Sequence, residues 1–263
     1  MVLSAAFATT PGNTYSENQD AILVDGVVHQ GKHTGEIMID APRALLAVAD
    51  GLAVSPCAAR ASRTALGLLA AAYRMGAPLS DVSLKTVRAG MIAAAGRHCR
   101  GMACTIAAVS LHAAGATIVH AGDCRVYLHR DGSLDALTED HTVLRRMIRD
   151  GMVDPAQAAE LGAAYLDPDS ALIADPYEDE FEVGVRELAL RDGDVLILAS
   201  DGLSALLSDA GAGPLIRRGL DATLGELARS LVAAAVGESA NDDNASVIVA
   251  RYGLGQASAG LTS

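Results

Sequence analysis

Apolar residues along this chain occur in short runs that end at Gly, Asp or Pro. Runs of about four to eight apolar residues with such endings are typical of buried β-strands. The sequence therefore predicts strands at residues 20–26, 35–40, 43–50, 104–112, 116–124, 125–132, 182–188, 194–200 and 244–253.

Four other stretches have the period of an amphipathic helix, at residues 55–76, 83–99, 142–152 and 222–237. Ser55 and Pro56 suggest an N-cap and first helical position for the first stretch, Gly76 should end it, and Asp221 should cap the last. The strands form two clusters with helices between them, without a βαβ alternation. This order predicts an α+β fold in which helices cover antiparallel sheets.

Length and charge limit the organisation and the partners. The 263 residues contain no internal repeat, so we expect one domain at 1–253 and a flexible tail at 254–263. No apolar run is long enough to span a bilayer, and the N-terminal residues do not have the pattern of a secretory signal. A net charge of −12 argues against nucleic-acid and anionic-membrane partners and is compatible with cation binding. We expect a cytoplasmic protein.

The four cysteines form no C-x-x-C pair and have no histidines at zinc-binding spacing. We therefore expect neither a zinc site nor a disulfide framework. Reduced and mostly buried thiols are the expectation for a cytoplasmic chain.

Carboxylates stand at the ends of five of the predicted strands. If these strands are neighbours, the carboxylates converge, and free anions at such distances would repel one another. Divalent cations remove that repulsion, and an oxygen-only ligand set selects hard ions such as Mg²⁺ or Mn²⁺. A single Asp-Gly pair usually marks only a turn, but the matching apolar flanks favour a shared metal site. The five residues are Asp20, Asp50, Asp123, Asp201 and Asp243.

The ordered segments NQDAILV, LLAVADGL, GMACTIAAV, HAGDCRVYLHRDGSLDALTEDHT, DVLILASDGL and DNASVIVA resemble the motif series of the metal-dependent serine/threonine phosphatases of type 2C, in a bacterial form. The resemblance extends from Asn18 to about Ala250. It implies two packed antiparallel β-sheets flanked by helices, an α-β-β-α sandwich, with a mobile flap at about 150–182. It also implies Mn²⁺ or Mg²⁺ as cofactor, with two ions in the core site and a weaker third.

The resemblance assigns a role to each carboxylate. Asp50 would bridge the two ions, and the Gly51 carbonyl would hold the second. Asp201 and Asp243 would hold the first ion, Asp20 would act through metal-bound water, and Asp123 would share the third ion with Asp201. The implied catalytic set is Asp20, Asp50 and Asp201.

The implied reaction is hydrolysis of phosphoserine and phosphothreonine by direct attack of a hydroxide that bridges the ions. The substrate would be a phosphorylated protein, the product of a serine/threonine kinase. Tyr15 stands where the family often has a phosphate-binding arginine, and a hydroxyl cannot replace the two charged hydrogen bonds of a guanidinium. His141, in EDHT, matches a family position that we interpret as structural.

Two alternatives remain open. The segment CAARASRT fits the loop of cysteine-dependent phosphatases, with Cys57 as nucleophile and Arg63 as phosphate ligand, although its alanines and helical period do not suit an anion-binding loop. The second alternative is a non-catalytic regulatory or binding module of the same fold, and Tyr15 is the residue that motivates it.

Overall fold

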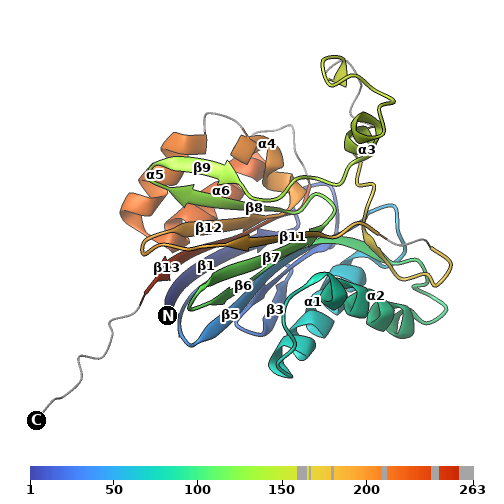
Figure 1. Cartoon of the computed structure of the whole chain (residues 1–263), viewed down its shortest axis with the longest axis horizontal. Coiled ribbons are helices and arrows are strands. Elements are labelled where there is room, and N and C mark those ends of the chain that lie inside the picture. The colour runs from blue at the N-terminus through green and yellow to red at the C-terminus, as the bar shows by residue number, and fades with distance from the viewer. Residues whose placement is uncertain (159–164, 166, 179–180, 209–211, 238–242, 255–263) are drawn as a thin grey trace, which may run out of the picture.

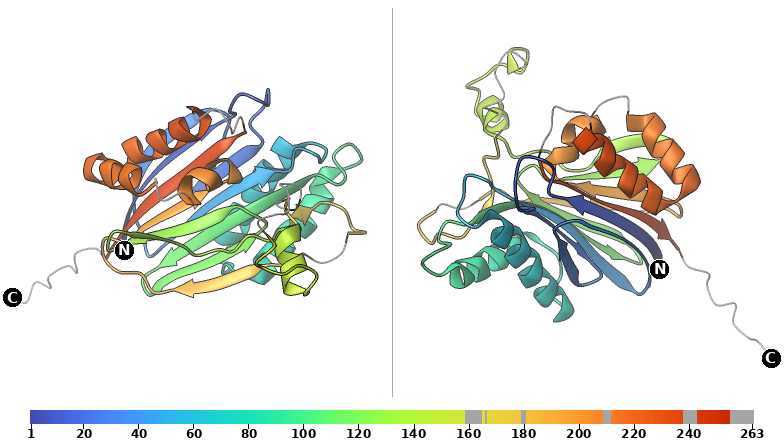
Figure 2. Two further views of the ribbon diagram at one scale, coloured as in Figure 1. Left: turned by 90° about the horizontal axis from the view of Figure 1, so that it is seen from above. Right: turned by 180° about the vertical axis from the view of Figure 1, so that it is seen from behind.

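The computed structural model describes residues 1–263 except 159–164, 166, 179–180, 209–211, 238–242 and 255–263. Two antiparallel sheets pack face to face, and helices cover both outer faces (Figures 1 and 2). The predicted α-β-β-α sandwich is confirmed. The tail predicted at 254–263 lies outside the described residues from 255 onward.

The first sheet has the strand order β4-β1-β13-β12-β8-β9. Its strands are β1 (Val2–Thr10), β4 (His33–Asp40), β8 (Arg125–Arg130), β9 (Ser133–Ala136), β12 (Val195–Ala199) and β13 (Ala245–Gly253). The second sheet has the order β11-β7-β6-β5-β2-β3, and β10 pairs with β6. Its strands are β2 (Asp20–Val24), β3 (Val27–Gln30), β5 (Arg43–Gly51), β6 (Ala103–His112), β7 (Gly115–Ala121), β10 (Leu172–Ile173) and β11 (Gly184–Leu188).

The helices form two outer layers (Figure 2). The helices α1 (Ala58–Arg74) and α2 (Asp81–Ala95) cover the second sheet. The first sheet is covered by α4 (Ser204–Ser208), α5 (Ala212–Ala222) and α6 (Leu224–Gly237). The short 3₁₀ helix η3 (Asp201–Leu203) follows β12, and α3 (Val143–Arg149) follows β9.

Strand β5 shows how the sequence builds this sandwich. Its residues alternate between two cores, because successive side chains of a strand point to opposite faces. Leu45 and Ala47 pack against the α1 and α2 layer, whereas Leu46 and Val48 pack between the sheets. Both faces are buried, which explains why the strand reads as a continuous apolar run.

Two predicted helix caps are wrong. Helix α1 begins at Ala58 with Cys57 as its N-cap, because the chain through Ser55 forms a turn in which the Ser55 N–H donates to the Leu52 carbonyl. Asp221 lies inside α5, and Thr223 precedes α6, where its hydroxyl accepts from the Glu226 N–H at 3.0 Å. The predicted end of α1 near Gly76 is confirmed.

The expectation of four reduced thiols is wrong for one pair. Cys57 and Cys99 form a disulfide, whereas Cys104 and Cys124 are free and buried. The pair is 42 residues apart in sequence, and only the packing of α1 beside α2 brings it together. Sequence spacing therefore carried no sign of it.

The segment 150–182, predicted as a flap, begins after α3. Figure 1 shows α3 and part of the chain that follows it standing away from the sandwich. The segment returns to the second sheet through β10, where Leu172 pairs with Cys104. Among the described helices, none is long and apolar enough to cross a membrane.

The disulfide gives a stability prediction. Cys57→Ser should lower the free energy of unfolding by about 4 kcal/mol, since the crosslink closes a loop of 42 residues in the unfolded chain. Urea denaturation measures the loss. Added dithiothreitol should reproduce it in the wild type and have no further effect on the variant. Finding four titratable thiols in the unreduced, denatured wild type would contradict the bond.

Candidate metal centre

The strand register places two of the predicted carboxylates side by side. Asp20, the first residue of β2, is the partner of Asp50, the penultimate residue of β5. On the other side of β5, Asp50 is the partner of Thr105 in β6. The antiparallel pairing alone therefore places three oxygen-bearing side chains next to one another, at one end of the strands of the second sheet.

Asp50 and Thr105 line a pocket of about 400 Å³. Six of the predicted site residues line it, and Asp20 is fully buried next to Asp50. No Lys, Arg or His is among the lining residues that the structure describes. The lining consists of Tyr15, Gln19, Asp50, Gly51, Leu52, Ala53, Val54, Thr105, Asp123, Asp167, Pro168, Asp201 and Asp243.

Asp20 links the two sheets through a buried hydrogen bond. Its Oδ2 accepts from the Ser200 hydroxyl at 2.7 Å, and Ser200 Oγ accepts from the Ser246 N–H at 3.1 Å. The other oxygen, Asp20 Oδ1, is buried without a hydrogen-bond partner, and so is Asp201 Oδ1. Buried polar atoms without partners are costly, so two such carboxylate oxygens in one region are suited to binding a cation.

Two glycines allow the strand ends to approach one another. A Cβ on Gly51 would come within 2.2 Å of the Ala58 carbonyl oxygen, and one on Gly202 within 2.0 Å of the Asn244 carbonyl oxygen. Any side chain would force these backbones apart. This explains why glycine follows both Asp50 and Asp201, the repeated Asp-Gly pair of the sequence.

Two asparagines fix the loops around the site. The Asn18 amide donates to Thr9 Oγ1 and to the Gly31 carbonyl, and Asn18 Oδ1 accepts from the Asp20 N–H at 3.0 Å. Asn244 Oδ1 accepts from the Gln19 N–H at 2.7 Å, and its amide donates to the Pro11 carbonyl. The loop before β2 is therefore tied to the loop before β13.

Asp123 reaches the pocket from the turn between β7 and β8. Gly122, with φ +96°, allows this turn, since a Cβ there would meet the Thr105 side chain at 2.3 Å. Asp201 reaches the same pocket from the start of η3. Segments at the ends of strands from both sheets thus bring carboxylates to one pocket.

The pKa values of these carboxyl groups rise because the groups are buried and lie close to one another. Burial raises the pKa of Asp50 well above its usual range, and the charges of Asp20 and Asp201 add to the effect. Burial likewise raises the pKa of Asp20 and of Asp201 to about 6. For Asp123, burial and the Asp201 charge raise the pKa to about 7. The folded chain therefore holds carboxylates where free anions are unfavourable.

The donor set fits a hard divalent cation. The described lining presents oxygen atoms and no sulfur or imidazole ligand, and it includes Asp201, whose Oδ1 is buried without a partner. Among the described residues, no three acidic, histidine or cysteine side chains already stand close enough to enclose an ion.

Several contributors were not singled out from the sequence. Ser200, Asn244 and Thr105 all lie inside the quoted motifs, and the available signal was a polar residue within or at the end of an apolar run. Cys57 and Arg63 are not among the pocket-lining residues, and the Cys57 sulfur is in a disulfide. A nucleophilic cysteine needs a free thiolate, so this geometry opposes the cysteine-dependent alternative.

No family model matches the chain. Two bacterial proteins are similar to parts of it. Serine/threonine protein phosphatase PstP of Mycobacterium tuberculosis is 33% identical over 176 residues, which cover 63% of this chain and 32% of PstP. A protein of Streptococcus pyogenes described as protein phosphatase 2C-type is 34% identical over 110 residues, which cover 42% of this chain and 43% of the other. The matches thus span less than half the length of these curated relatives.

The fold is also that of solved phosphatases. The crystal structure of the catalytic domain of PstP in complex with two manganese ions superposes with a TM-score of 0.66 at 27% identity, over 95% of this chain and 99% of that one. The resemblance inferred from the motifs is confirmed: the chain is similar in sequence and in fold to bacterial serine/threonine phosphatases of type 2C.

The close approach at Gly51 can be tested with a matched pair of variants. Gly51→Ala should lower the free energy of unfolding by about 1–3 kcal/mol through overpacking against the Ala58 carbonyl. Gly67→Ala, inside α1 with no atom within 4 Å of its added Cβ, should instead raise it by about 0.5–1 kcal/mol. Urea unfolding measures both. Equal effects of the two substitutions would contradict the packing described for Gly51.

Proposed function

We propose that this chain is an Mn²⁺- or Mg²⁺-dependent protein phosphatase that hydrolyses phosphoserine and phosphothreonine. The observation that carries the proposal is the pocket itself, where carboxylates from several strand ends converge without a basic side chain in the described lining. The similarity to type 2C phosphatases, one of them solved with two manganese ions, supports it.

The residues that would hold the ions are those predicted from the sequence. Asp50 lies between Asp20 and Thr105 in the register, which suits a ligand shared by two ions. Asp201 and Asp243 would complete the first ion site, and the Gly51 carbonyl the second. Asp123 would hold a weaker third ion together with Asp201. When bound, the ions would activate water and neutralise the phosphate oxygens.

The chain's own groups then orient the substrate. Because no Lys, Arg or His is among the described residues of the lining, the phosphate would depend on the ions for positive charge. Tyr15 offers a hydroxyl, and its pKa is raised by burial and by the charges of Asp243 and Asp50, so that it stays protonated and can donate to a phosphate oxygen. Gln19 offers an amide in the same pocket.

The residues around the site also control its water. Ser200 keeps one oxygen of Asp20 engaged, so that only Oδ1 remains to accept from a water molecule near the ions. Asp167 and Pro168 of the segment 150–182 line the pocket, and we propose that this flap segment influences which phosphoprotein enters. A serine/threonine kinase would supply that substrate, and action in the cytoplasm stays a prediction.

The function is tested by hydrolysis of p-nitrophenyl phosphate and of phosphothreonine peptides with and without Mn²⁺. Wild type should turn over only with the ion, and chelation should abolish activity. Asp50→Asn should lower kcat by at least about 100-fold, since it removes the charge shared by both ions. Asp135→Asn, an exposed position on β9, should leave activity unchanged.

The outcomes separate the alternatives. Metal-dependent turnover that survives Cys57→Ser excludes a cysteine nucleophile. If wild type binds Mn²⁺ but hydrolyses neither ester, the proposal fails and the non-catalytic binding module of the same fold takes its place.

A further inference from the structure

In the turn that carries Asp123, the backbone of Gly122 is held by one residue, His141. The Gly122 N–H donates to His141 Nδ1 at 3.3 Å, and the Gly122 carbonyl accepts from the His141 N–H at 3.0 Å. Both backbone polar groups of Gly122 are therefore bonded to a residue 19 positions later in the chain. His141 and Asp123 are both buried.

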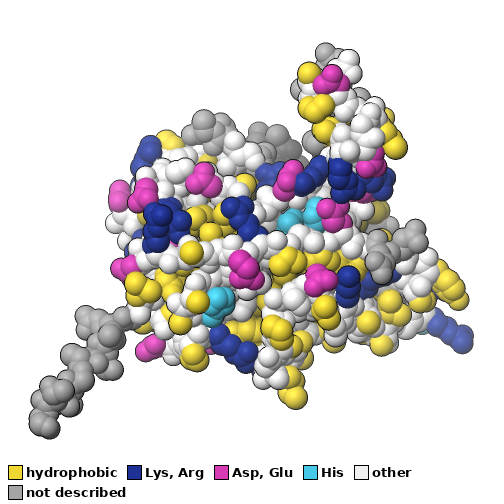
Figure 3. Space-filling view, viewed as in Figure 1, with side chains coloured by type: hydrophobic (Ala, Val, Ile, Leu, Met, Phe, Trp, Pro, Cys, Tyr) yellow, Lys and Arg dark blue, Asp and Glu magenta, His cyan; other side chains and the backbone are white. Residues whose placement is uncertain are grey.

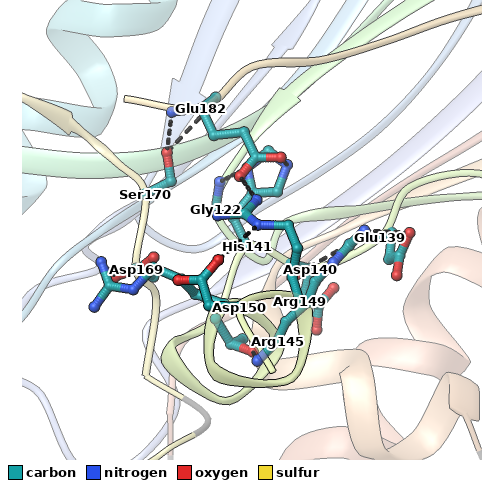
Figure 4. A network of polar contacts seen from close by, with 12 residues as sticks. Gly122, Glu139, Asp140, His141, Arg145, Arg149, Asp150, Asp169, Ser170 and Glu182 are labelled. Carbon is teal, nitrogen blue, oxygen red and sulfur yellow. Dashed lines mark hydrogen bonds and ion pairs between the residues drawn. The ribbon is translucent and has the colours of Figure 1, made fainter. Parts of the chain in front are cut away.

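On its other side, His141 contacts the flap segment. The His141 carbonyl accepts from the Asp169 N–H at 2.8 Å. Ser170 follows, and its hydroxyl donates to the Glu182 carbonyl at 3.0 Å while accepting from the Glu182 N–H at 2.8 Å. Figure 4 shows His141 between Gly122 and these flap residues, with the Glu182 side chain facing it.

Charged groups of α3 surround this contact without entering it. The Arg149 guanidinium pairs with Glu182 Oε2 at 2.6 Å, and Arg146 pairs with Asp169 Oδ1 at 2.6 Å. Figure 3 shows basic and acidic side chains interleaved near histidine where the projecting segment meets the sandwich. The ion pairs hold the flap segment at the surface, whereas the buried His141 connects it to the Gly122–Asp123 turn.

The bonds of His141 require the neutral imidazole with its proton on Nε2, because Nδ1 accepts from Gly122. Burial, with help from neighbouring His120, lowers the pKa of His141 to about 4, which favours this form. The two rings stack at a centroid distance of 4.5 Å. His120 itself bonds elsewhere, through Nε2 to the Glu139 carbonyl at 2.9 Å.

We propose that His141 is a positioning residue that fixes the Gly122–Asp123 turn against flap residues 169–170 and thereby directs Asp123 toward the shared ion. The proposal rests on the function proposed above, in which Asp123 is an ion ligand. It assigns to His141 a role beyond the structural one expected from the sequence.

Three variants separate this role from simple packing. In His141→Asn the amide oxygen lies one bond beyond Cγ, as Nδ1 does, so it can accept from the Gly122 N–H. His141→Leu has similar bulk and no acceptor. His120→Leu is the matched control, since it removes the stacked neighbour and leaves both Gly122 bonds.

Two measurements apply to each variant: hydrogen exchange at the Gly122 amide and calorimetric Mn²⁺ affinity. His141→Leu should speed exchange of the Gly122 amide by about 10-fold. It should also lower the affinity of the weaker Mn²⁺ site by about 3- to 10-fold, which corresponds to the loss of one buried hydrogen bond. His141→Asn and His120→Leu should stay within about twofold of wild type. In an Asp123→Asn background, His141→Leu should have no further effect on affinity, because both changes act on one site.

Unchanged Mn²⁺ affinity in His141→Leu would overturn the proposal, and so would equal losses in the Asn and Leu variants. A failure of the proposed function is seen in the wild type itself, which would then bind no Mn²⁺ or bind it without hydrolysing either ester. Exchange at Gly122 still reports whether His141 holds the turn in that case, so the two failures are distinguishable.

Discussion

The structure depends on one unfavourable interaction, the burial of several carboxylates beside one another. The sheet register places Asp20 next to Asp50, and Asp201 and Asp123 face the same pocket without a basic neighbour in its described lining. The raised pKa values of Asp20 and Asp123 have the same cause, burial next to other carboxylates. Such a cluster persists because many contacts of the surrounding fold hold it in place, as is general for strained functional sites.

The surroundings supply that rigidity through ordinary packing. Strand β5 is buried on both faces, so it cannot move away to relieve the repulsion at Asp50. Gly51 and Gly202 let the backbones approach within a distance that no side chain would permit. Asn18 and Asn244 then tie the loops before β2 and β13 together. The site is thus a product of both sheets, and no single strand would form it.

The sequence predicted the parts of this account that follow from local pattern. Strand ends such as Leu45–Asp50 were predictable, because a strand that is buried on both faces is a continuous apolar run, and here the run ends at a polar residue. Strand β1 was missed, since its small residues carry a weak pattern. The Cys57–Cys99 bond and the contacts of His141 join positions far apart in sequence, and only the assembled fold brings them together.

If the cluster is built for a divalent cation, as we propose, its carboxylates destabilise the metal-free chain. Calorimetric unfolding of wild type and Asp201→Asn at pH 7.5, with chelator and then with Mn²⁺, tests it most directly. Without ions, the variant should melt a few degrees higher, since a neutral amide replaces a repelled charge. Mn²⁺ should raise the midpoint of the wild type far more than that of the variant. A metal-free variant that melts below wild type, or a wild type indifferent to Mn²⁺, would contradict the account.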